Sequence, residues 1–120
     1  MKFMVEGKAG ERVLDLQYER VFAIGYAGRN MEKTMEHIKE LEQELGVPAP
    51  KKIPTIFQCG NYVLTQERNL AFVGNKTCGE VEYVIILSHG KIYIGVGSDH
   101  TDRELEAVSV PKAKQICAKP

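Results

Sequence analysis

The clearest hydrophobic pattern in the chain lies at residues 31–45 and predicts one helix. Apolar residues recur there at spacings of three and four, which places them on one face of an α-helix. Asn30 is a favoured N-cap residue, Gly46 is a common helix stop, and Pro48 prevents the helix from resuming. The apolar stripe consists of Met31, Met35, Ile38, Leu41 and Leu45.

Most of the remaining chain is patterned as short strands. Residues 2–16 predict a hairpin, and the apolar run 21–24 predicts a buried strand. Ser88-His89-Gly90 predicts a tight turn between two later strands. We therefore expect a single α+β domain, mostly β, over residues 1–120. The later strands are expected at Ile53–Phe57, Tyr62–Thr65, Leu70–Val73, Glu80–Leu87 and Lys91–Val96.

The C-terminal third carries three more expectations. The strand at 80–87 is apolar on both faces, which is typical of a strand covered on both sides. A helix-like segment is expected at Arg103–Ala107, with Asp99 or Thr101 as its N-cap. Residues 111–120 contain lysines but no acidic residue and predict an irregular tail, so that the chain stops without a closing strand.

Composition excludes some classes of partner. Lys plus Arg and Asp plus Glu both number 16, so the chain has no bulk attraction to nucleic acid or to an acidic membrane. The apolar fraction of 43% is that of an ordinary globular protein. Three cysteines without a CxxC pair indicate reduced thiols. No signal peptide and no bilayer-spanning apolar run is present, so we expect a cytoplasmic protein.

Three acidic residues suggest a metal site. Glu80 and Glu82 are two apart in a strand, so both side chains point to the same face, with Cα atoms roughly 7 Å apart. The next turn returns Asp99 toward them. Oxygen donors of this kind suit Mg²⁺ or Mn²⁺, and His100 would be a neighbour rather than a ligand. The alternative is that these acids simply face solvent.

A second pair of interest lies on the predicted helix. His37 and Glu40 are three residues apart and therefore adjacent on the helix surface. A carboxylate beside an imidazole orients the ring and raises its pKa, as a general base requires. The alternative is an incidental surface pair on an acidic helix.

These residues match a known pattern. Glu80-Val81-Glu82, followed by the segment Gly95–Glu106, resembles the fumarylacetoacetate hydrolase superfamily, in which a Glu-x-Glu strand leads through a hairpin to an Asp-containing segment. The likeness is greatest to a bacterial branch, DUF2848, which shares the signature Gly-Ser-Asp-His-Thr-Asp-Arg. Further similar stretches are Gly28-Arg29-Asn30, Glu36–Leu41, Pro54–Phe57 and Lys114–Pro120.

The resemblance implies an incomplete β-roll corresponding to the N-terminal half of the family fold. It also implies roles for single residues. Lys114, or alternatively Lys112, would hold the carboxylate or enolate of the substrate, and Tyr26 and Arg29 would contact the substrate. Glu80, Glu82 and Asp99 would be the ligands of Mg²⁺ or Mn²⁺, and His37 with Glu40 would activate a water molecule.

The implied reaction is hydrolytic C–C cleavage or decarboxylation of a small 2-oxo or 1,3-dicarbonyl acid through a metal-stabilised enolate. Because family members continue beyond the matched segment, we expect a homo-oligomer or a complementary C-terminal-half chain to complete the protein. The alternative is a non-catalytic half-domain with a structural or regulatory role.

Overall fold

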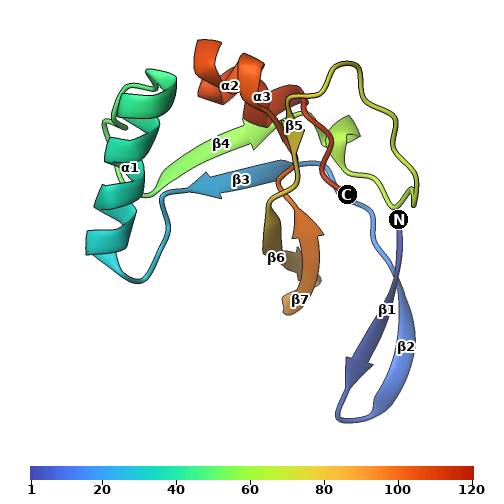
Figure 1. The fold of residues 1–120 in the computed structure, drawn as a ribbon. Coiled ribbons are helices and arrows are strands. Elements are labelled where there is room, and N and C mark those ends of the chain that lie inside the picture. Colours follow the sequence, from blue (N-terminus) through green and yellow to red (C-terminus); the bar gives the residue numbers. More distant parts are fainter.

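The strands of this protein form four separate two-stranded antiparallel sheets rather than one large sheet (Figure 1). The structure is a computed structural model that describes residues 1–120. It contains more strand (37%) than helix (26%), which confirms the predicted α+β, mostly β, fold class. The sheets pair β1 (Lys2–Gly7) with β2 (Gly10–Asp15), β3 (Val21–Gly25) with β4 (Thr55–Cys59), β5 (Thr77–Cys78) with β8 (Thr101–Asp102), and β6 (Val81–Ser88) with β7 (Lys91–Ser98).

Helix α1 (Met31–Leu45) lies between β3 and β4 in the sequence and has the predicted bounds. The Asn30 side chain accepts from the Lys33 N–H at 3.1 Å, and Gly46 ends the helix in the left-handed conformation at φ 65°. The helix forms one end of the molecule (Figure 1). Within its apolar stripe only Ile38 is buried.

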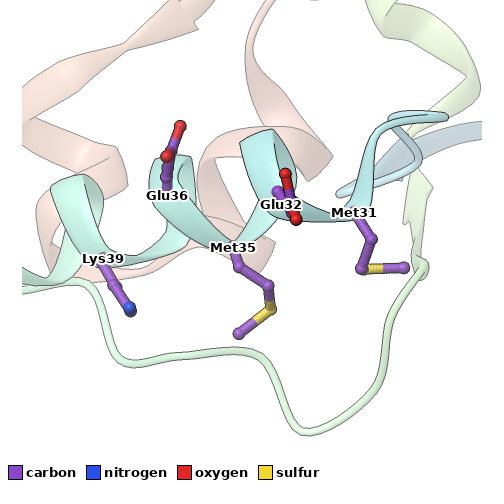
Figure 2. A pocket seen from close by; sticks show the side chains of 5 residues that line it. All are labelled: Met31, Glu32, Met35, Glu36 and Lys39. Atoms are coloured by element: carbon purple, nitrogen blue, oxygen red, sulfur yellow. The ribbon is translucent and has the colours of Figure 1, made fainter.

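The first turns of α1 bear a shallow surface hollow. Figure 2 shows Met31, Met35 and Lys39 on one side of the helix and Glu36 on the other. Met31 is 55% exposed and Met35 41% exposed. The apolar periodicity therefore predicted the helix correctly, but only part of its apolar stripe is covered.

Two predicted strands are absent. Residues Asn61–Val63 form a short 3₁₀ helix, η1, instead of the start of the strand expected at Tyr62–Thr65. The strand expected at Leu70–Val73 has no regular structure, and Val73 is 98% exposed. A β-rich composition stabilises a strand only where a neighbouring strand can pair with it. Leu64 forms a single isolated bridge with Lys119, and residues 70–73 pair with no strand.

The C-terminal segment is more ordered than its sequence predicted. Helix α2 (Arg103–Val108) begins as expected, but its N-cap is Asp102, whose carboxylate accepts from the Leu105 N–H at 3.0 Å. The tail predicted as irregular forms helix α3 (Val110–Ile116). Ser109 caps this helix by accepting from the Lys112 N–H, and a proline in the first turn fits a helix start.

The β6–β7 hairpin turns at His89-Gly90, as predicted, and projects from the rest of the molecule (Figure 1). The expectation that β6 is covered on both faces was wrong, because Tyr83 is 71% exposed and Ile85 55% exposed.

No helix is long and apolar enough to cross a membrane. The small apolar core comprises Leu16, Ile38, Val47, Cys59, Val63 and Ala113.

Candidate functional site

The register of the β6–β7 hairpin brings two carboxylates opposite each other just beyond its open end. Val81 pairs with Ser98, and the next residues outward, Glu80 and Asp99, continue the ladder through a bond from the Asp99 N–H to the Glu80 carbonyl at 2.9 Å. The Ser98 hydroxyl also accepts from the Glu80 N–H at 3.0 Å. Like charges in this position repel each other unless a cation lies between them.

Lys114 of α3 supplies that cation. Its Nζ lies 2.5 Å from Asp99 Oδ2 and 3.5 Å from Glu80 Oε2, and its side chain is 10% exposed. The second Asp99 oxygen, Oδ1, is buried and lies 2.8 Å from the Nζ of Lys119, whose side chain is 8% exposed. The Lys119 ammonium also donates to the His100 carbonyl at 3.0 Å. Asp99 is thus held between two buried lysines.

Arg103, the first residue of α2, completes the arrangement. Its guanidinium lies 2.9 Å from Glu80 Oε1 and 2.6 Å from the buried Glu106 Oε2, and it donates to the sulfur of Cys78 at 3.7 Å. Arg103 and Glu106 are one helical turn apart, which makes this contact local. We call the set of three acids and three cations the charge cluster: Glu80, Asp99, Glu106, Arg103, Lys114 and Lys119.

Mutual pairing decides the charge states inside the cluster. Burial raises the pKa of Asp99, but the hydrogen bonds and charges of Lys114 and Lys119 outweigh it and leave the pKa below its ordinary value. Burial lowers the pKa of Lys114, but the hydrogen bond and charge of Asp99, with Glu80 and Glu106, leave it raised. The pKa of Arg103 is raised by Glu106 in the same way, against the effect of its burial. All three groups are therefore charged at neutral pH.

The backbone around the cluster explains why these side chains meet. The fully buried Thr101 donates its hydroxyl to the Asp99 carbonyl at 3.1 Å, and the ring of His100 stacks on Phe72 with centroids 4.2 Å apart. The last residues run beside two other segments: the Lys119 N–H donates to the Val63 carbonyl at 2.7 Å, and the Ser98 N–H donates to the Pro120 carbonyl at 2.7 Å. These contacts fix the turn after β7 and the path of the C-terminal residues, and so the positions of Asp99 and Lys119.

A large open cavity of about 1640 Å³ adjoins the cluster, between β3, α1 and β6. Of the eight residues predicted for the site, only Glu40 does not line it. Arg29 lies on its wall without an ion pair. Lys112 does not line the cavity; its ammonium donates to Gln115 at 3.0 Å on the surface. The predicted residues that line it are Tyr26, Arg29, His37, Glu80, Glu82, Asp99 and Lys114.

The three proposed metal ligands are only partly assembled. Glu80 and Asp99 face one lysine ammonium, whereas Glu82 is exposed and makes no hydrogen bond or ion pair. No group of three His, Cys, Asp or Glu side chains is close enough together to hold a metal ion. The donor chemistry of Glu80 and Asp99 fits a hard cation, and the Lys114 ammonium lies between the two carboxylates.

The other predicted residues lie apart from the charge cluster. His37 Nδ1 is 3.9 Å from Glu40 Oε2, and both side chains are more than half exposed on α1. Neither has an ion pair with the cluster. Tyr26 is closer: burial, followed by the charge of Glu106, raises its pKa, and the residue adopts a positive φ of 58°. Such a backbone is uncommon for a bulky residue and occurs often at functional sites.

Sequence reasoning missed Arg103, Glu106 and Lys119 as members of the site. The spacing of Arg103 and Glu106 on a short helix was a usable signal, because residues three apart on a helix are neighbours. Lys119 gave no such signal, since its position depends on how the last residues pair with the segment near Val63. Cys59 lies within the field of Asp99, Lys119 and Lys114, and burial is the main cause that raises its pKa.

The fold and cluster define a small α+β protein with a buried ion-pair network beside an open cavity. Comparison with family models gives the finer assignment: residues 24–120 match the model described as "Protein of unknown function (DUF2848)". The chain therefore belongs to the DUF2848 family. No curated protein and no solved structure matches it.

Proposed function

We propose that this chain is a divalent-metal-dependent hydrolase or lyase acting on small 2-oxo or 1,3-dicarbonyl acids, and that its family belongs to the fumarylacetoacetate hydrolase superfamily. The observation that carries the proposal is the meeting of Glu80 and Asp99 at one cation beside a cavity. Under this proposal the compartment is the cytoplasm, where its three unpaired cysteines stay reduced.

Mg²⁺ or Mn²⁺ would be held by Glu80, Asp99 and Glu82. When bound, the metal supplies a Lewis acid that stabilises the enolate of a 2-oxo acid. Glu82 is the ligand free to join the other two, because its side chain is exposed and unpaired on the cavity wall. Lys114 would give up its position between the carboxylates and hold the carboxylate or enolate of the substrate.

Charge balance supports an anionic substrate. The cluster contains three acids and three cations, and burying an uncompensated charge beside it is costly. A divalent cation together with a dianionic enolate adds no net charge, whereas either one alone does. Tyr26 and Arg29 on the cavity wall are the residues proposed to contact the rest of the substrate.

His37, oriented by Glu40, is the proposed base that takes a proton from water before attack on the carbonyl carbon. What supports this role is that His37 and the cluster line the same cavity. A homo-oligomer or a complementary chain would complete the catalytic unit, since the side chains of His37 and Glu40 are more than half exposed and pair only with each other.

A second candidate is a non-catalytic structural or regulatory role. It is favoured by the observation that every charge in the cluster already has a partner without any ligand. A purely structural network of this kind needs neither Glu82 nor the cavity.

Titration calorimetry with Mn²⁺ and Mg²⁺ tests the metal assignment. Wild type should bind at least one of them, and Glu82→Gln should weaken binding by tenfold or more. Glu44→Gln, at an exposed position on α1, is the matched control and should bind as wild type does. Unchanged affinity in Glu82→Gln contradicts the assignment. Metal binding without turnover of acylpyruvates would favour the non-catalytic role.

A further inference from the structure

One face of the β6–β7 hairpin is entirely uncharged and open to solvent. Directly opposed residues of an antiparallel pair share a face, and the register pairs Tyr83 with Val96, Ile85 with Ile94 and Leu87 with Ile92. Val81 and Ser98 complete the same face. Each of its seven apolar residues is between 55% and 83% exposed, and we call them the hairpin face: Val81, Tyr83, Ile85, Leu87, Ile92, Ile94 and Val96.

This face is too large for a free monomer surface. Seven such side chains expose an area on the order of 900 Å², above the roughly 300–600 Å² of the largest apolar patch on a typical monomer. An isolated two-stranded hairpin is also marginally stable in water. On the opposite face, Arg12 of β2 donates to the Tyr93 hydroxyl at 2.8 Å.

The total surface is also larger than that of a compact monomer. A folded monomer of 13.4 kDa should expose about 6500 Å². This chain exposes 9280 Å². The excess, about 2800 Å², is larger than the roughly 1000–2500 Å² that each subunit buries in an obligate dimer and larger than the hairpin face alone, so other open surfaces of the chain also contribute to it. The radius of gyration, 15.9 Å, likewise exceeds the roughly 13.6 Å expected for a compact chain of this length.

We propose that the hairpin face is the interface of a homodimer, in which two copies pack face to face about a twofold axis. A twofold contact brings the same patch of each subunit together, so any charge near the axis would meet its own copy. The hairpin face has none. The chain as a whole carries 16 positive and 16 negative side chains, so two copies do not repel each other at long range.

The two hairpins would form a small β-sandwich, with the sheets ~10 Å apart and the apolar side chains of both copies interleaved between them. The side chain of Glu82, which pairs across with Gly97, lies on the opposite side of the hairpin. Tyr83, Ile85 and Leu87 of the hairpin face also line the cavity beside the charge cluster, so the partner's hairpin would cover one wall of that cavity. The inference does not depend on the proposed chemistry, and its test measures association rather than metal binding or turnover.

Sedimentation equilibrium of the 120-residue chain tests the proposal. Wild type should be a dimer at micromolar concentration. Val96→Asp should weaken the dimer at least 100-fold, and Val73→Asp, at a still more exposed valine in a loop, should leave it unchanged. A monomeric wild type, which is the result expected if a different chain covers the face, overturns the proposal. A Val96→Asp variant that is folded by circular dichroism and still dimeric also overturns it.

If Val96→Asp does not fold, hydrogen exchange on wild type decides the question. Diluting the protein from above to below the dissociation constant of the dimer should accelerate amide hydrogen exchange in residues 81–98. Exchange of the amides of α1 should be unchanged. Exchange in the hairpin that is independent of protein concentration overturns the proposal.

Discussion

Lys114 Nζ donates to Asp99 Oδ2 at 2.5 Å, and the two side chains are only 10% and 18% exposed. The contact joins the end of β7 to α3 across fifteen residues of sequence. Asp99 holds Lys119 as well, so a single carboxylate compensates two buried ammonium groups. Removing it leaves both lysines without their closest negative charge.

Asp99→Asn should therefore destabilise the protein by about 3–5 kcal/mol, the range found when one partner of a buried ion pair is removed. Asp15→Asn is the matched control, because Asp15 pairs with the N-terminus at 3.7 Å on the surface and is 56% exposed. The control should change stability by less than about 1 kcal/mol. Urea unfolding followed by circular dichroism measures both, and equal stability of the two variants would contradict a structural role for the cluster.

The same carboxylate should give the protein a characteristic loss of stability in acid. The pKa of Asp99 is lower in the folded state than its ordinary value of 3.8, so its contribution is fully present above that pH. It is lost as the pH falls from 3.8 through the folded-state pKa. The free energy of unfolding of wild type should thus decline more steeply below pH 3.8 than that of Asp99→Asn. Parallel curves for the two proteins would refute this.

Lys114 should make the free energy of unfolding decline in base rather than in acid. Its folded-state pKa is raised above the ordinary 10.5, so its contribution is fully present below that pH and is lost as the pH rises through the higher value. Wild type should lose stability above pH 10.5, and Lys114→Met should show a shallower decline there. Lys112→Met, on the surface of the same helix, is the control and should behave as wild type does.

The elements that could be predicted from sequence are those whose determinants are local. Helix α1 has its cap, stop and apolar stripe within seventeen residues, and its bounds agree with the prediction. Helix α3 was missed although Ser109 and Pro111 form a local start signal, because the lysines that follow resemble a solvated tail. Two of those lysines are buried only because Asp99 compensates them.

The site could be predicted only where strand pairing determines it. The turn at His89-Gly90 sets the register, and the register sets Glu80 opposite Asp99. Lys119 could not be found, since its place depends on pairing between the last residues and the segment near Val63. The expectation that β6 is covered on both sides failed for a related reason: sequence records that a face is apolar, not which surface covers it.

Substitution of Gly97 tests the contact between β7 and the last residue, Pro120. A Cβ at this position would lie 2.8 Å from Val84 Cγ2 and 3.1 Å from the Pro120 carbonyl oxygen, which accepts from the neighbouring Ser98 N–H at 2.7 Å. Gly97→Ala should therefore cost about 1–3 kcal/mol, as overpacking does. Gly95→Ala, two residues away with no atom within 4 Å of its Cβ, should be neutral or stabilising. Thermal unfolding compares the two, and equal effects would argue against the contact.

The turn of the β6–β7 hairpin offers a stabilising substitution. His89 and Gly90 both have positive φ, at 48° and 70°, as the two central residues of a type I′ turn do, and Asn-Gly is the preferred pair at these two positions. His89→Asn should raise the free energy of unfolding by about 0.5–1 kcal/mol, although it removes an exposed contact between the Ser88 hydroxyl and the imidazole. His37→Asn, on the exposed face of α1, is the control and should be slightly destabilising, because asparagine is a poor helix former. If both variants are destabilised alike, His89 is not under backbone strain in the folded protein.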